Sequence, residues 1–371
     1  MAYLTVEATR QGHASYAHVH EIVTGLRRLG IEVDLYEPSN GGGSGRSNLA
    51  ARLVDQLRIQ ARLFVRWARY DAIYVRAHYT AFPTAAVGRV TGRPVVQEVN
   101  GPFADVFIAY PWTRPLAPLL LFLHRRQLRW ADALIAVTPA LRDWIGKQTG
   151  RHDAEVIPNG ANIELFAPNR TTTRALPETF VVFFGALTPW QGVETLLAAF
   201  EHRDWPEHVE LVILGDGMLQ GSVAEAAARH ERLHWFGRVP YAEVGAIVAR
   251  ARAGLVPKNS QGNRQDTGLF PLKLFEIASC GVPVIVTDFP GQAEFVREYD
   301  CGLVIRPESP AALADAVRRL TESPTLSAEM GGRGRAAVAS AHSWGHRAEH
   351  AARVLRRATA RVAEAVSHLS V

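Results

Sequence analysis

The sequence predicts an α/β protein built from two doubly wound domains with parallel sheets, and three observations lead to this fold class. Short apolar or β-branched runs alternate with segments of helical periodicity, and a parallel strand pair needs such a crossover. This alternation occurs six times, is interrupted at residues 168–177 by a stretch rich in Pro, Asn and Thr, and then occurs six times again. Finally, 371 residues are too many for one ordinary core and suit two domains of roughly 150–200 residues each.

The predicted strands are short runs of apolar residues, and the helices occupy the intervals between them. In the first half the strands are residues 3–6, 31–35, 72–75, 94–99, 134–137 and 155–157. In the second half they are residues 180–184, 209–214, 233–236, 254–257, 283–286 and 302–305. Helical patterns include residues 19–29, 49–69, 193–200, 223–230, 272–280 and 311–321.

These elements divide the chain into three parts. We expect one Rossmann-like domain at residues 1–165 and a second at residues 166–340. Residues 341–371 are rich in Ala and Arg with a helical apolar stripe, and we expect them to pack back toward the first domain. Ligands bind beyond the carboxyl ends of parallel strands, so the cleft between two such domains is the expected place for a site.

Composition and termini exclude several classes of protein. A hydrophobic content of 47% and a charged content of 21% exclude a largely disordered chain. Cys280 and Cys301 are too few for a disulfide scaffold or a structural zinc site. The N-terminus reads as a strand rather than a signal segment, and the longest apolar stretch, near residues 116–123, is far shorter than the ~20 residues of a membrane span. We therefore expect a cytoplasmic protein.

The net charge of +5 is concentrated in one half of the chain. Residues 1–170 contain 20 basic and 14 acidic side chains, whereas residues 171–371 contain 21 and 22. Nearly all basic residues are arginines, because Lys147, Lys258 and Lys273 are the only lysines. A large anionic partner is therefore expected at the first half.

Two arginine groups in that half have two open interpretations. Arg58, Arg62 and Arg66 recur at four-residue steps and share one helical face, and three more arginines follow the apolar run at residues 116–123. Either these faces attach to anionic lipid on the inner face of a membrane, or they are solvated faces of helices packed on the sheet. Nucleic-acid binding is not expected, since no helix-turn-helix or aromatic–basic pattern accompanies the arginines.

Six segments of the second half carry the more specific signal. They are residues 156–166 (VIPNGANIELF), 184–193 (FGALTPWQGV), 214–218 (LGDGM), 235–239 (WFGRV), 271–285 (PLKLFEIASCGVPVI) and 342–344 (HSW). In this order and spacing they resemble glycosyltransferase family 4, whose members have the GT-B architecture and retain the anomeric configuration. The resemblance implies a nucleotide-sugar donor bound by the second domain, a glycan, lipid-linked or small-molecule acceptor at the first, and no metal or cofactor.

The resemblance also assigns donor-binding residues. Glu276 occupies the ribose-binding glutamate position, and a carboxylate can accept hydrogen bonds from both ribose hydroxyls. Gly185, Gln191, Gly192 and Gly215 belong to the two glycine turns. The backbone amides of a further segment are expected to hold donor hydroxyls or phosphate, namely those of Gly268, Leu269 and Phe270.

Three positions depart from the family pattern. Ala186 and Gln191 stand where a basic residue and a lysine are common, and Gly268 stands where a second glutamate is expected. Lys273, three residues before Glu276, is the expected replacement charge for the leaving diphosphate. Lys258 and Arg264 are weaker candidates, each equally readable as a solvated loop charge. Asp266 either reaches the donor sugar as a catalytic carboxylate or serves as a turn former.

In the first domain the candidates are fewer. Gly12 and His13, in the first strand-to-helix loop, are expected to contact acceptor or donor. Asn100 stands where many family members have a histidine near the sugar, and it is expected to donate a hydrogen bond to a sugar hydroxyl. We assign no nucleophile and no protein base, because in this architecture the donor phosphate is thought to deprotonate the acceptor.

Two other functions remain open at this stage. A nucleotide-sugar 2-epimerase shares the two-domain architecture, and a non-catalytic partner of another transferase would explain Ala186, Gln191 and Gly268. Incubation with donor alone separates the first from a transferase, because an epimerase converts the sugar whereas a transferase gives slow hydrolysis.

Overall fold

The computed structural model describes residues 1–9, 14–38, 49–102, 107, 111–260 and 268–369. The chain falls into two compact units, each described here by itself. Unit 1 contains Ser15–Pro158, the strand before it and the chain from Gly345 onward, and unit 2 contains Asn159–Trp344. The divisions therefore lie at 158/159 and 344/345, compared with expected boundaries after residues 165 and 340.

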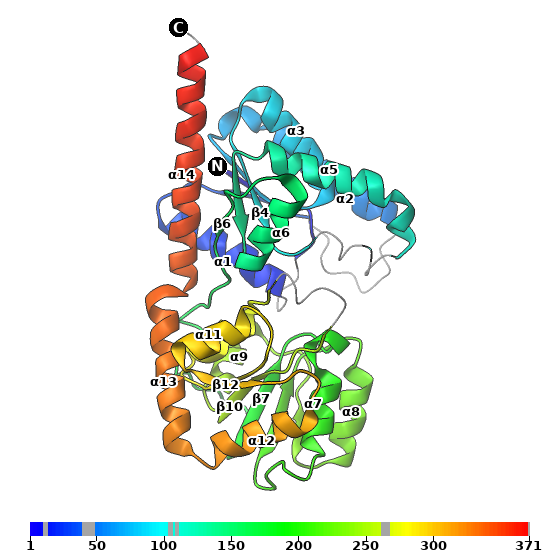
Figure 1. Ribbon diagram of the computed structural model, residues 1–371, viewed down its shortest axis with the longest axis vertical. Coiled ribbons are helices and arrows are strands. Elements are labelled where there is room, and N and C mark those ends of the chain that lie inside the picture. Colours follow the sequence, from blue (N-terminus) through cyan, green and yellow to red (C-terminus); the bar gives the residue numbers. More distant parts are fainter. Residues whose placement is uncertain (10–13, 39–48, 103–106, 108–110, 261–267, 370–371) are drawn as a thin grey trace. The chain divides into compact units, whose positions relative to one another are not determined.

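Unit 1 is built on a six-stranded parallel sheet (Figure 1). Its strands are β1 (Ala2–Leu4), β2 (Asp34–Tyr36), β3 (Ile73–Arg76), β4 (Val95–Val99), β5 (Ala133–Ala136) and β6 (Glu155–Val156), in the order β2-β1-β3-β4-β5-β6. Its helices are α1 (Ala14–Arg28), α2 (Leu49–Val65), η1 (Trp67–Arg69), η2 (Tyr79–Ala81), α3 (Phe82–Thr91), η3 (Pro111–Leu116), α5 (Ala117–Trp130), α6 (Pro139–Thr149) and α14 (Trp344–Leu369).

Unit 2 repeats the plan with a second six-stranded parallel sheet. Its strands are β7 (Phe180–Phe184), β8 (Glu210–Leu214), β9 (Leu233–Trp235), β10 (Ala253–Val256), β11 (Val284–Thr287) and β12 (Gly302–Ile305), in the order β12-β11-β10-β7-β8-β9. Its helices are η4 (Pro189–Gln191), α7 (Val193–Phe200), α8 (Gln220–Arg229), α9 (Tyr241–Val248), α10 (Leu272–Ser279), α11 (Gln292–Tyr299), α12 (Pro310–Thr321) and α13 (Pro324–Ala341).

The central strand β7 illustrates why these residues form such a sheet. All five of its residues are buried, and alternate side chains enter two separate core clusters. Val182 and Phe184 join one cluster, whereas Val181 and Phe183 join the other. A strand covered on both faces needs a continuous apolar run rather than an alternating one. Each of the twelve predicted strands is present, so the predicted α/β fold class is confirmed.

Helix α14 packs along unit 1 through a small-residue stripe. Ala348, Ala351 and Leu355 are among its buried residues. At β6, the Glu155 carboxylate contacts His350 Nε2 at 3.2 Å and also pairs with Arg357. Apolar burial and a charge pair thus hold the C-terminal helix in place. Among the described residues, no helix combines the length and apolar composition needed to cross a membrane.

Candidate donor site at the glycine turns of unit 2

The strand order of unit 2 reverses at β7. From β7 the chain moves through β8 to β9 on one side, and β10, β11 and β12 extend the sheet on the other. Open parallel sheets bind ligands at such a switch point, outside the carboxyl ends of the strands. The loops after β7, β8 and β10 meet there, and most of the sequence-predicted donor residues lie on them or on α10.

The first two glycine turns are joined by backbone hydrogen bonds. Gly185 N donates to Leu214 O at 2.9 Å, and Leu187 N donates to Asp216 O at 2.8 Å. Gly185 and Gly215 have φ values of +121° and +132°. A Cβ on Gly215 would lie 1.9 Å from Gly185 O, so a side chain at that position would force the two turns apart. The structure thus brings these two predicted residues together.

Gly192 brings the loop after β7 against the loop after β10. Its φ is +76°, and a Cβ there would lie 1.6 Å from Pro257 O. Thr195, in the first turn of α7, donates through Oγ1 to Asn259 Oδ1 at 3.0 Å. A bare backbone at Gly192 is therefore needed for α7 to begin beside the end of β10.

Lys273 lies beneath these turns, and Gln191 holds it. The Lys273 side chain is buried, and its Nζ donates to Gln191 Oε1 at 3.0 Å. The same ammonium lies 4.1 Å from the centroid of the Phe183 ring and 3.1 Å from where a Cβ of Gly185 would be. The residue that replaces the family's lysine is thus an amide that positions a lysine from α10.

The environment of Lys273 lowers the pKa of its ammonium well below the ordinary value of 10.5. Burial is the largest cause, and repulsion by Lys258 adds to it, whereas Glu276 favours the charged form. Because burial and Lys258 destabilise the charged form of Lys273, a bound anion would stabilise that form strongly. A diphosphate is such an anion.

Glu276 lies one helical turn after Lys273, and it too is buried. Its Oε1 accepts a 2.7 Å hydrogen bond from the hydroxyl of Tyr241, the first residue of α9. The Tyr241 ring packs against Phe166 with ring centroids 5.2 Å apart. Tyr241 therefore orients the carboxylate. The sequence did not indicate this residue, although it lies only two positions after the WFGRV segment.

The segment Gly268–Phe270 is less available than the sequence suggested. Gly268 has a φ of +74°. Leu269 N donates to Pro290 O at 2.7 Å, and Phe270 O accepts from Asn159 Nδ2 at 2.7 Å. The Leu269 amide is therefore used within unit 2. The expected role of the Gly268–Phe270 amides in holding donor groups stays a prediction. Arg264 and Asp266 lie outside the described residues.

In unit 1, Asn100 is tied to a buried acid that sequence reasoning missed. Asn100 Nδ2 donates to Glu98 Oε1 at 2.7 Å, and Tyr74 Oη donates to Glu98 Oε2 at 2.5 Å. His18 Nε2 lies 2.5 Å from Glu98 Oε1. The sequence signal that could have identified Glu98 is a glutamate within a predicted buried strand. Gly12 and His13 lie outside the described residues.

This cluster determines the orientation of the Asn100 side-chain amide. Burial raises the pKa of Glu98, but the charges of His18 and Arg76 and the hydrogen bonds from His18 and Tyr74 outweigh it and bring the pKa to about 2. An ionised carboxylate only accepts hydrogen bonds, so the amide nitrogen must face it. The carbonyl Oδ1 of Asn100 therefore points away from Glu98 and can accept a hydrogen bond, whereas the second Nδ2 hydrogen can still donate. The expected hydrogen bond from Asn100 to a sugar hydroxyl stays a prediction.

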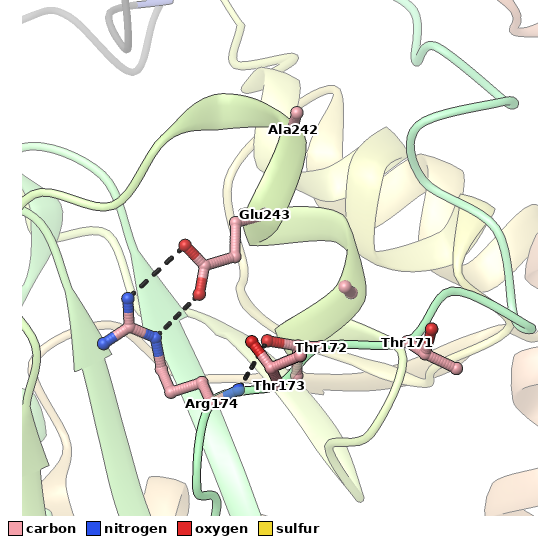
Figure 2. A pocket seen from close by; sticks show the side chains of 7 residues that line it. Thr171, Thr172, Thr173, Arg174, Ala242 and Glu243 are labelled. Carbon is pink, nitrogen blue, oxygen red and sulfur yellow. Dashed lines mark hydrogen bonds and ion pairs between the residues drawn. The ribbon is translucent and has the colours of Figure 1, made fainter.

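A separate hollow of about 510 Å³ lies between residues 171–174 and α9 (Figure 2). Arg174 Nε donates to Glu243 Oε1 at 2.8 Å, and the Arg174 guanidinium lies 5.0 Å from the Phe236 ring centroid. Figure 2 shows the guanidinium and carboxylate facing each other, with Thr172 and Thr173 beside them. Because Arg174 is already paired with Glu243, this ion pair fastens residues 171–174 of unit 2 to α9. We place the candidate donor site at the glycine turns instead.

Both halves of the chain match models of known protein families. A model of the family described as "Glycosyl transferases group 1" matches residues 169–337, and one described as "Glycosyltransferase Family 4" matches residues 17–165. The D-rhamnosyltransferase WbpZ of Pseudomonas aeruginosa is 29% identical over 234 residues, which cover 59% of this chain and 57% of that relative. The chain thus spans little more than half of that protein. Glycogen synthase of Mycobacterium tuberculosis is 24% identical over 87% of this chain and 78% of its own.

Solved structures show the same architecture. Sucrose-phosphate synthase from Thermosynechococcus elongatus superimposes with a TM-score of 0.77 at 18% identity, covering 97% of this chain and 98% of that one. Anabaena Alr3699/HepE in complex with UDP gives 0.72 at 17% identity, with coverages of 96% and 99%. At these identities the likeness concerns the fold. Both halves of the chain match the family's models and both sheets match its fold, so the chain belongs to glycosyltransferase family 4 and is a glycosyltransferase with the GT-B architecture.

Proposed function

We propose that the protein is a retaining glycosyltransferase that moves a sugar from a nucleotide-sugar donor to a glycan, lipid-linked or small-molecule acceptor. One observation carries the proposal: the buried Lys273 ammonium lies beneath the Gly185 turn, held by Gln191. Glu276 lies one helical turn further along α10. A cation and an acceptor carboxylate at this spacing suit the diphosphate and the ribose of one nucleotide.

Each group has a defined part in the proposed reaction. The first amides of α7, which begins at Val193, are offered to the diphosphate, and the bare backbone at Gly185 and Gly192 lets the diphosphate approach closely. Lys273 stabilises the charge that develops on the leaving diphosphate, so no metal ion is needed for that step. Glu276, oriented by Tyr241, accepts hydrogen bonds from the ribose hydroxyls.

On the sugar side, Asn100 accepts a hydrogen bond from a hydroxyl through Oδ1. The donor phosphate takes the proton of the attacking acceptor hydroxyl, so the new bond forms on the face that the diphosphate leaves. That geometry gives retention without a protein nucleophile.

Relatives narrow the donor and acceptor classes to be tested. Anabaena Alr3699/HepE has been solved with UDP and with UDP-glucose. A relative from Corynebacterium glutamicum is named as a GDP-mannose-dependent mannosyltransferase acting on a monoacylated phosphatidylinositol monomannoside. These names support a nucleotide diphosphate sugar as donor and a lipid-linked glycan as one acceptor class. The basic unit 1 suits an anionic acceptor, and we propose a cytoplasmic protein that attaches peripherally to a membrane.

The test is a panel of nucleotide sugars read by released nucleotide, combined with binding of UDP and GDP by calorimetry. We expect Glu276→Ala to weaken binding of the preferred nucleotide by about 10–100-fold, since hydrogen bonds to a charged group contribute roughly 1.5–3 kcal/mol. Glu225→Ala, an exposed residue on α8 of the same unit, is the matched control and should bind as the unchanged protein does. Equal affinities in both variants would contradict the proposal.

The same panel separates the other two functions. Conversion of the donor sugar without acceptor identifies an epimerase, and nucleotide binding without turnover on any acceptor identifies a non-catalytic partner. Retention is read from the anomeric configuration of the product by NMR.

A further inference from the structure

The exposed large apolar side chains of the described residues are unevenly distributed. Eleven are exposed, and all but Met218 belong to unit 1. Eight of them lie on two helical segments, α2 and η3–α5: Leu53, Val54, Leu57, Val65, Trp112, Leu116, Leu119 and Phe122. Scattered exposed apolar residues are normal on a protein surface, whereas a concentration on two helices points to a partner.

Helix α5 has one buried and one exposed face. His124, Gln127 and Leu128 are buried against unit 1. On the opposite side Leu119 and Phe122 are 55% and 56% exposed, and the arginines that the sequence singled out follow one to two turns later.

The contacts that these arginines make within the protein do not neutralise their charges. Arg125 donates to the Gln148 amide oxygen at 2.8 Å, and Arg129 donates to Thr149 O at 3.0 Å. The Arg126 guanidinium lies 5.2 Å from the Trp130 ring centroid. All three partners are uncharged, so the end of α5 remains cationic beside an apolar face.

Helix α2 repeats the arrangement. Ile59 and Leu63 are buried in the core of unit 1, whereas Leu57 and Val65 are 57% and 87% exposed on the opposite side. Arg58, Arg62 and Arg66 are all exposed. Within the described part of the chain, only Arg58 of the three contacts an acid, with Nη1 3.4 Å from Asp55 Oδ1.

Both helices attach to the same short segment of unit 1. Gln60 of α2 donates to Thr80 O at 2.9 Å, and Gln127 of α5 donates to His78 O at 3.0 Å. Both also pack against η2. Since each turns its buried side toward this segment, the two exposed sides belong to one helical layer of unit 1. We call the exposed residues of α2 and η3–α5 the α2/α5 face.

We propose that the α2/α5 face docks on an anionic phospholipid bilayer, with its apolar side chains entering the interface and its arginines contacting lipid phosphates. Charge complementarity selects this occupant, because an apolar stripe flanked by arginines matches an anionic headgroup layer above acyl chains. An exposed Trp beside Leu and Phe is typical of such interfaces. The inference rests on the proposed function in one respect: a membrane-borne acceptor would be the reason for the protein to bind a membrane.

The experiment is vesicle flotation of the full chain at low salt. Vesicles of phosphatidylcholine with phosphatidylglycerol are compared with vesicles of phosphatidylcholine alone. We expect binding to the anionic vesicles, weakened by high salt. Leu119→Ser with Phe122→Ser should reduce the partition coefficient about tenfold or more. Arg125→Glu with Arg126→Glu should reduce it by more than about 25-fold, since each arginine near an anionic surface contributes about fivefold and each new glutamate adds repulsion.

Two matched controls locate the effect. Arg203→Glu with Arg229→Glu makes the same charge change at exposed positions of unit 2, and Val90→Ser removes an apolar side chain that is 87% exposed on α3. Both should float with the anionic vesicles to a greater extent than the α5 variants. Circular dichroism and thermal melting confirm that every variant is folded.

Three outcomes would overturn the inference: no binding of the unchanged protein to anionic vesicles, equal binding by the α5 variants, or an equal loss in the unit 2 control. A dimer in solution that the Leu119/Phe122 variant splits would also overturn it, by showing that the face contacts another chain. Nucleotide release from a water-soluble donor without vesicles is measured in parallel. The α5 variants should keep this nucleotide release. A failure of the membrane inference is therefore distinguished from a failure of the transferase proposal.

Discussion

At the residue scale, the candidate donor site has its lysine on α10, whereas the family commonly has one in the loop after β7. Gln191 occupies the family's lysine position, yet its amide oxygen accepts from Lys273 Nζ and keeps that ammonium beneath the Gly185 turn. The positive charge is supplied from α10 instead of from the loop itself. A substitution that suggests inactivity in the sequence is therefore compatible with a charged diphosphate site.

The lowered pKa of Lys273 predicts that nucleotide binding is coupled to proton uptake. Burial and Lys258 favour the neutral amine in the unoccupied site, whereas a bound diphosphate favours the ammonium. Nucleotide diphosphate binding should therefore take up a proton between the lowered pKa of Lys273 and the ordinary lysine value, and affinity should fall as pH rises through that interval. Calorimetry in buffers of different ionisation enthalpy measures the uptake. Lys273→Met should abolish it, and Lys147→Met, on α6 of unit 1, should leave it unchanged.

Unit 1 offers a second residue-scale lesson. Glu98 is buried inside a parallel sheet and contacts His18 of α1, Tyr74 of β3 and Asn100, which follows its own strand. Burying a carboxylate without partners is costly, so such clusters are retained where they orient something. Here the oriented group is Asn100, whose carbonyl is turned away from the acid.

At the scale of elements, the glycine turns make the switch point of unit 2 usable. The loops after β7, β8 and β10 approach one another more closely than any side chain would allow. Bare backbone, rather than charged side chains, then lies at the place where a diphosphate is expected.

Gly192→Ala tests this contact. Its φ of +76° and the 1.6 Å approach of a Cβ to Pro257 O should destabilise the protein by at least the roughly 1–3 kcal/mol of a strained backbone and weaken nucleotide binding. Gly221→Ala is the matched control, because Gly221 lies in α8 with nothing within 4 Å of its Cβ position. That variant should gain about 0.4–1 kcal/mol. Denaturant unfolding measures both, and equal stabilities would refute the role given to Gly192.

At the scale of the whole molecule, the two compact units carry different chemistry. The candidate nucleotide groups belong to unit 2, whereas the exposed apolar and arginine-rich helices belong to unit 1. The sequence already separates these properties, since the positive excess lies in residues 1–170. A division of labour between donor binding and acceptor or membrane contact follows.

This division predicts that mutations in the two units have additive effects. Glu276→Ala should weaken nucleotide binding without changing flotation, and the Leu119/Phe122 variant should do the reverse. In the combined variant both free-energy changes should add within about 0.5 kcal/mol, as expected for sites that share no contacts. A larger coupling, measured by calorimetry and flotation on all four proteins, would show that the two functions depend on each other.

Much of this could be predicted because the signals are local. Each strand is a contiguous apolar run, and Lys273 and Glu276 stand in one short segment with glycines at fixed places. Tyr241 could not be predicted as the partner of Glu276, since nothing in the sequence couples positions 35 residues apart. The use of the Leu269 amide by Pro290 was missed for the same reason.

The sequence by itself determined the alternation of strands and helices, the two parallel sheets and the family to which the chain belongs. Periodicity and motif order are properties of neighbouring residues, so they can be read along the chain. Only the tertiary structure decided that Gln191 holds Lys273, that Glu98 turns the carbonyl of Asn100 outward, and that apolar residues of α2 and α5 stay exposed. These are contacts, or missing contacts, between distant residues, and packing alone sets them.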